Sequence, residues 1–228
     1  ARRPQGHRQA CRPQGQDPRQ PPARQHPGRR TWLTGQHLKN SVAGGGDVTI
    51  APTANSDVLN LFQGGQLDGA WVPEPYASRL VLDGGGHVLV DEKDLWPHGQ
   101  FVTTHLVVRT EFLKKYPDTV AALLRGHVAA VKEATGDATK AKTAVNAALT
   151  AGGGKALSSQ VLDRAWSELT VTYDPIASAL KKSAANGVSA GTTQKAVDLK
   201  GIYDLRPLNA VLKAQNLDPV SAGGLGQE

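Results

Sequence analysis

A tryptophan and a glutamate stand close together where the chain must change its conformation. Trp71 lies in a short apolar run that ends at Val72, and this run predicts a buried strand. Pro73 and Pro75 prevent the strand from continuing, and the fixed φ of Pro75 suits the first turn of a following helix. Trp71 and Glu74 are therefore expected at the carboxyl end of a strand, where open α/β sheets bind their ligands. The alternative is that Trp71 is a core residue beside an ordinary loop.

The other reactive residue types form no catalytic or metal-binding pattern. The seven histidines lack the His-Glu-x-x-His spacing of zinc enzymes, and the single cysteine, Cys11, rules out an internal disulfide. Gly152-Gly153-Gly154-Lys155 is similar to a phosphate-binding loop, but Ala156 stands where serine or threonine is needed, so we expect a linker. A Gly-x-Ser-x-Gly nucleophile motif is also missing. We therefore expect a protein without catalysis, metal or cofactor.

Positive charge is concentrated at the beginning of the chain. Eight arginines and one aspartate give residues 1–30 a net charge of +7, against +6 for the whole chain, so residues 31–228 carry −1. Residues 1–30 also hold six prolines and six glutamines but no large apolar side chain, which predicts a disordered tail. Such a tail could bind nucleic acid through charge, whereas residues 31–228 give no reason to expect a nucleic-acid partner.

Beyond residue 30 the pattern predicts strands alternating with helices, and then a helical second half. The expected strands are Val48–Ile50, Asp68–Val72, His87–Val90 and Phe101–Arg109. The expected helices begin near Trp32, at Asn55 or Ser56 as the capping residue, and at Pro75, Pro117, Ala138, Ser158 or Ser159, Asp174 and Pro207. The helix after Asp174 should stop at Asn186-Gly187, and residues 220–228 should fray. Strand, helix and strand in this order favour a parallel sheet.

The segment Asp68 to Ser78 (DGAWVPEPYAS) resembles the solute-binding proteins of ABC importers. Val48-Thr49-Ile50, Thr53 to Asp57 and Phe101–Arg109 belong to the same resemblance, which covers roughly Thr31 to Pro219 and is strongest to the aliphatic sulfonate, nitrate and taurine group. It implies an α/β, periplasmic-binding-protein-like (type 2) remnant, with a parallel-rich sheet, flanking helices and a helical C-terminal half.

The resemblance also implies a division of the chain. Residues 31–99 would belong to the second lobe and residues 100–219 to the C-terminal part of the first lobe, followed by the frayed residues 220–228. Because related proteins begin with about a hundred residues that have no counterpart here, the resemblance implies an N-terminally truncated form with exposed apolar surface.

The function implied by the resemblance is capture of a small anion and its delivery to a membrane permease by a monomeric extracytoplasmic protein, periplasmic or on the cell surface. The ligand would be an aliphatic sulfonate, in sulfur metabolism, with nitrate or taurine next. No export signal is visible in the chain. The alternatives are a thiamine-precursor pyrimidine-binding protein of the same fold and an arginine-rich nucleic-acid-binding protein acting through residues 1–30.

Six residues are the expected ligand-binding set under this resemblance. A sulfonate is a weakly basic fixed anion, so neutral donors at a helix start, such as Asn55 and Ser56, suit it, although Asp57 beside them opposes an anion. Trp71 could contact the apolar part of the ligand, and Thr103 and Thr104 could donate from the other lobe. The sixth residue, Glu74, is expected to bond the backbone of its own loop; ordinary structural roles remain the alternative for both threonines.

A different origin for residues 1–30 explains their composition. If the codons of Ala10 to Arg29 are read one base later, suitable third bases give PADLKGKTLANPPLGNTQDVA, the kind of segment that related proteins carry just before the counterpart of Arg30. The third base of each original codon, which can often vary, becomes the middle base of the shifted codon. This freedom makes a match to the family segment easier to obtain. The hypothesis is that the tail is an out-of-frame translation, and sequencing the DNA across codons 1 to 31 tests it: a frame that cannot encode this peptide would rule it out.

Overall fold

The computed structural model describes residues 27–41, 45–191 and 193–228. The predictions made for residues 1–26, including the disordered tail and Cys11, lie outside the described residues.

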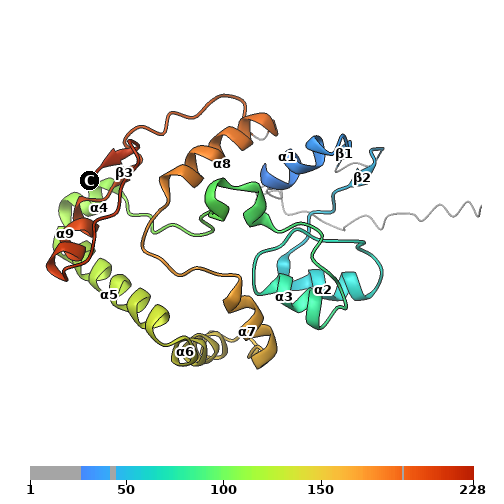
Figure 1. The fold of residues 1–228 in the computed structure, drawn as a ribbon, viewed down its shortest axis with the longest axis horizontal. Coiled ribbons are helices and arrows are strands. Elements are labelled where there is room, and N and C mark those ends of the chain that lie inside the picture. The colour runs from blue at the N-terminus through green and yellow to red at the C-terminus, as the bar shows by residue number, and fades with distance from the viewer. Residues whose placement is uncertain (1–26, 42–44, 192) are drawn as a thin grey trace, which may run out of the picture.

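Helices dominate the described residues. The α-helices are α1 (Pro27–Gly35), α2 (Asn55–Gln63), α3 (Tyr76–Leu82), α4 (Thr110–Lys115), α5 (Pro117–Gly136), α6 (Ala138–Ala151), α7 (Ser159–Ser167), α8 (Ala177–Ser189) and α9 (Arg206–Ala214). The 3-10 turns are η1 (Glu92–Leu95) and η2 (Pro97–Gly99), and the strands are β1 (Asn40–Ser41), β2 (Val48–Thr49), β3 (Tyr203–Asp204) and β4 (Gly226–Gln227). The helices pack in pairs, with α5 against α9, α1 against α8, and α3 against both α2 and α7 (Figure 1).

The sheet is much smaller than the sequence pattern suggests. The described residues form two ladders, β1 with β2 and β3 with β4; both are parallel, as expected, but each has only two residues per strand. Asp68–Val72, His87–Val90 and Phe101–Arg109 were expected to be strands, and in the structure they are irregular. An extended segment becomes a strand only when a neighbour takes its backbone hydrogen bonds, and these three segments have no such neighbour among the described strands.

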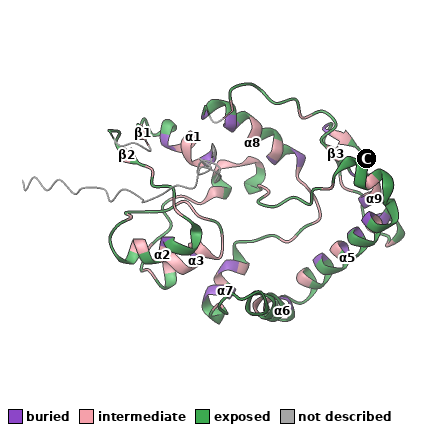
Figure 2. Cartoon of the chain, turned by 180° about the vertical axis from the view of Figure 1, so that it is seen from behind, coloured by how far each residue is buried: buried purple, intermediate pink, exposed green. Residues whose placement is uncertain are grey.

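The main apolar core lies between α5 and α9. On α5 a stripe of Val120, Leu124 and Val128 is buried, and it meets the apolar face of α9. The α9 side of this core consists of Leu208, Val211 and Leu212. Figure 2 shows buried positions where these two helices face each other, with exposed residues on their outer sides. The three-to-four-residue spacing of apolar positions explains why α5 was predictable from sequence.

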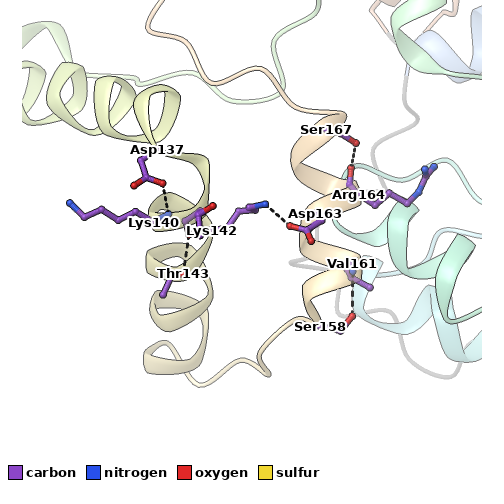
Figure 3. Close-up of polar contacts among 10 residues, drawn as sticks. Asp137, Lys140, Lys142, Thr143, Ser158, Val161, Asp163, Arg164 and Ser167 are labelled. Carbon is purple, nitrogen blue, oxygen red and sulfur yellow. Dashed lines mark hydrogen bonds and ion pairs between the residues drawn. The ribbon is translucent and has the colours of Figure 1, made fainter.

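A hairpin of α6 and α7 continues from α5. Ser158 caps α7, as expected, by accepting a hydrogen bond at Oγ from the Val161 N–H at 3.3 Å. Lys142 of α6 reaches across to the carboxylate of Asp163 on α7 (Figure 3). The two helices are therefore joined by a charged contact on their exposed side, while Val161 and Ala165 bury the other face of α7.

Three expected boundaries differ from the structure. Ala54, and not Asn55 or Ser56, precedes α2 at the capping position, and its side chain makes no cap. Asn186 and Gly187 do not stop α8 but are buried inside it, because packing on α1 outweighs their preference for a turn. Residues 220–228 do not fray: β4 pairs with β3, and Glu228 accepts hydrogen bonds from Ser221 Oγ at 2.6 Å and from Ala222 N–H at 2.8 Å.

Candidate functional site

Trp71 lies in the irregular segment between α2 and α3 and is half-buried. Its ring is tilted against that of Trp32 on α1, with 6.1 Å between the ring centroids and 51° between the planes. The indole Nε1–H of Trp71 donates a hydrogen bond to Oε2 of Glu92. The tryptophan that the sequence singled out is therefore held from two sides, by another tryptophan and by a carboxylate.

Glu92 binds a second tryptophan with its other oxygen. Its Oε1 accepts a hydrogen bond from Trp96 Nε1–H at 2.7 Å, and the Trp96 ring stacks on Phe101 at 5.3 Å with 18° between the planes. We call Trp32, Trp71, Glu92, Trp96 and Phe101 the Trp–Glu cluster. It brings together α1, the segment before α3, η1 and the segment that follows η2.

Sequence reasoning missed Glu92 as a member of this site. The bond from Trp71 to Glu92 spans 21 positions, so no local pattern reveals it. One signal was available: Glu92 and Trp96 are four residues apart, which places two side chains on the same side of a helical turn.

Glu74 bonds its own loop, as expected. Its Oε2 accepts a hydrogen bond from the Ser78 backbone N–H at 3.0 Å, inside α3. This bond occupies one oxygen of the carboxylate and satisfies one of the N–H groups that the first turn of a helix leaves without a partner. Glu74 thus acts on the start of α3 rather than on the Trp–Glu cluster.

Asn55 and Ser56 are both exposed at the start of α2. The Ser56 hydroxyl donates to Oδ1 of Asp57 at 3.1 Å, so this donor already has a partner, and that partner is an anion. The Asp57 N–H donates to the Ala54 carbonyl at 2.9 Å, so the neutral donors that this helix start can offer a ligand are the N–H groups of Asn55 and Ser56.

Thr103 and Thr104 are exposed and lie in the irregular segment that replaces the expected strand. The next residue, His105, anchors this segment. Its Nε2 lies 3.2 Å from the Tyr203 hydroxyl, and the two rings stack with 6.1 Å between their centroids. Burial, and then the negative charge of Asp174, raise the pKa of Tyr203, so its hydroxyl stays protonated at neutral pH. The segment that carries the two threonines is therefore connected to β3 through His105.

The six expected residues do not form one cluster of contacts. Trp71 packs with residues that the sequence did not single out. The others contact their own loop or helix, as Glu74 and Ser56 do, or lie exposed on separate segments, as Asn55, Thr103 and Thr104 do.

Two open hollows lie elsewhere on the described surface. One of about 450 Å³ lies beside the end of α1 and is lined by Arg30, Thr34, His37, Leu38, Lys39 and Asn40. The other, of about 500 Å³, lies along α9 and the chain that follows it.

No group of three or more histidine, cysteine, aspartate or glutamate side chains in the described part of the chain is arranged to hold a metal ion. None of the described helices is both long enough and apolar enough to cross a membrane.

Comparison with known proteins gives one match. The family model described as the NMT1-like family matches residues 26–149, which is more than half of the chain. The matched region contains Trp71, Glu92 and the whole Trp–Glu cluster. No curated protein and no solved structure matches the chain.

Proposed function

The chain belongs to the NMT1-like family, and from this premise we propose that it is the substrate-binding component of an ABC importer, which captures a small ligand against Trp71 and delivers it to a membrane permease. The observation that carries the proposal is the Trp–Glu cluster, because it holds a half-buried tryptophan through Trp32 and Glu92 within the matched region. The protein acts by binding alone, outside the cytoplasm, as a monomer.

The first ligand class is a small anion, an aliphatic sulfonate, with nitrate and taurine next. The alkyl part of a sulfonate fits an indole face, and the first-turn N–H groups of α2 suit its weakly basic oxygens. Asn55 and Ser56 supply this helix start, while Thr103 and Thr104 add hydroxyl donors from the segment that His105 anchors. Such donors bind an anion without a buried cation.

The second ligand class is a pyrimidine related to thiamine precursors, and one observation favours it. The carboxylate of Glu92 accepts a hydrogen bond from the Trp71 indole N–H, and the Asp57 carboxylate accepts one from the Ser56 hydroxyl at the start of α2. Two negative charges repel a sulfonate, but they attract the amino groups of an aminopyrimidine, whose flat ring stacks on an indole. Of the two classes, this arrangement of charges favours the pyrimidine.

Calorimetric titration tests the two ligand classes side by side. The panel contains methanesulfonate, butanesulfonate, taurine, nitrate and a 4-aminopyrimidine, each titrated into the same protein preparation. Saturable one-to-one binding of a single class identifies the ligand. Silence from the entire panel contradicts the proposal.

Residues 1–30 require a separate control, because the nucleic-acid alternative rests on them and residues 1–26 lie outside the described part of the chain. Binding of an RNA oligonucleotide that falls steeply with salt, and that disappears when residues 1–30 are deleted, would favour that alternative. We expect no such binding by residues 31–228, whose net charge is −1.

A further inference from the structure

A single carboxylate holds two indoles in the Trp–Glu cluster. Oε2 of Glu92 accepts from Trp71 and Oε1 accepts from Trp96, so each oxygen serves one ring nitrogen. An indole N–H can only donate, and a carboxylate can only accept, so both bonds have a fixed direction. Hydrogen bonds to an ionised group are also roughly twice as strong as bonds between neutral groups.

The backbone that carries Glu92 is held by contacts within its own turn. Asp91 caps η1 by accepting at Oδ1 from the Lys93 N–H at 3.0 Å, and its Oδ2 pairs with Lys93 Nζ at 2.7 Å. In addition, η1 packs against α1, the helix that carries Trp32. The backbone position of Glu92 is therefore set within η1, and its carboxylate reaches the two indoles from there.

Trp71 lies in a segment without regular secondary structure, and two of its contacts come from distant parts of the chain. Residues 69–73 belong to no helix or strand, whereas the ring contacts Trp32 on one side and Glu92 on the other. The contact with Trp32 is tilted by 51°, and the hydrogen bond to Glu92 fixes the direction of the ring nitrogen. Glu92 thus contributes directly to the orientation of the Trp71 ring.

We propose that Glu92 is a positioning residue of the ligand site: its hydrogen bonds orient the indoles of Trp71 and Trp96, and through Trp96 it orients the ring stack with Phe101. This inference rests on the proposed function in one respect, that the ligand lies against Trp71. The clamp on the two indoles belongs to the ligand-free protein and is measurable without any ligand.

The test uses the indole N–H signals of the full chain in a proton–nitrogen correlation spectrum. The chain has four tryptophans, so four indole signals are expected, and single Trp→Phe variants assign them. Glu92→Gln is the informative change, because its amide oxygen accepts one indole while its NH₂ group faces the other, donor against donor. Glu168→Gln is the matched control, since Glu168 pairs with Lys93 on the same turn but binds no indole.

In Glu92→Gln we expect the Trp71 and Trp96 signals to move and to exchange faster with water, while the Trp166 signal stays. In Glu168→Gln all four signals should stay. Glu92→Asp keeps the charge and should retain protection of at least one of the two indoles, which separates loss of the clamp from general unfolding. Unchanged Trp71 and Trp96 signals in Glu92→Gln would overturn the inference.

Ligand affinity separates the two proposals. With the ligand that calorimetry identifies, Glu92→Gln should weaken binding about tenfold and Glu92→Asp less, because only the latter keeps the charged acceptor. Equal affinity in wild type and Glu92→Gln, despite displaced indole signals, would overturn the positioning role. If the indole signals respond but the wild type binds no ligand, the clamp stands and the proposed function fails.

Discussion

The side-chain amide of Asn209 makes two hydrogen bonds with the backbone of Val220. Its Nδ2 donates to the Val220 carbonyl at 3.0 Å, and its Oδ1 accepts from the Val220 N–H at 2.9 Å. Asn146 binds both backbone groups of Leu157 in the same way, at 3.0 and 2.8 Å. In both pairs a helical asparagine fixes the chain eleven residues later, and it replaces the backbone partner that a strand would supply.

Asn209→Ala should destabilise the protein by roughly 1–3 kcal/mol, because it leaves the N–H and the carbonyl of Val220, which is half-buried, without their partner. Urea unfolding followed by circular dichroism measures the change. Asn60→Ala, at an exposed position on α2, is the matched control and should change the free energy of unfolding much less. Equal effects of the two substitutions would contradict this role of Asn209.

Leu212→Ala should cost roughly 2–5 kcal/mol, because Leu212 is 0% exposed and its removal leaves a cavity between α5 and α9. Leu123→Ala provides the comparison: Leu123 is 50% exposed on α5, and its truncation should have a far smaller effect. The midpoints of thermal unfolding of the two variants, each compared with wild type, measure the two losses of stability. A Leu212 variant as stable as the Leu123 variant would show that α5 and α9 do not form the main core.

Arg206→Gln should raise the pKa of Asp204. The Arg206 guanidinium donates to both Asp204 oxygens, at 2.8 and 2.7 Å, and this hydrogen bonding, aided by the charge, holds the pKa of Asp204 below its usual value. A lowered pKa in the folded state means that the contribution of this pair to stability is present above the unfolded pKa. This contribution is lost as the pH falls through the pKa of Asp204 in the folded protein.

Carboxyl carbon chemical shifts of Asp204, followed through an acid titration, measure this pKa directly. We expect an upward shift in Arg206→Gln and none in Arg125→Gln, which removes an exposed arginine from α5. An unchanged Asp204 titration in Arg206→Gln would contradict the pairing.

The native protein should bind a hydrophobic fluorescent dye. Val107 is 84% and Leu89 is 79% exposed, and both lie in irregular segments whose apolar residues predicted strands. The double variant Leu89→Ser and Val107→Ser should reduce dye fluorescence, whereas Leu149→Ser on α6 should reduce it less. Absence of dye binding by the native protein would show that these side chains are covered in solution.

Helices were largely predictable from the sequence because their signals are local. Pro117 and Gly136 mark both ends of α5, and Ser158 caps α7 as its position suggests. Strands were not predictable, because apolar, β-branched residues such as those of Phe101–Arg109 favour an extended chain without specifying a partner. The stop expected at Asn186-Gly187 was wrong because packing of α8 on α1 buries both residues.

The candidate site was predictable only in part. Trp71 was recognisable because two prolines isolate it at a junction, and Glu74 bonds its loop as the sequence suggested. Glu92 was not recognisable as the partner of Trp71, because the hydrogen bond between Glu92 and Trp71 connects segments on either side of α3. Whether Asn55, Ser56, Thr103 and Thr104 contact a ligand stays a prediction.

The most direct test of the central claim is a calorimetric comparison of three proteins: wild type, Trp71→Ala, and Trp166→Ala as the control for loss of a half-buried tryptophan elsewhere. Each is titrated with the sulfonates, taurine, nitrate and the 4-aminopyrimidine. We expect one ligand class to bind the wild type and Trp166→Ala with the same Kd, and to bind Trp71→Ala at least tenfold more weakly. Equal affinity for Trp71→Ala, or no binding by the wild type, would contradict the claim that this protein captures its ligand against Trp71.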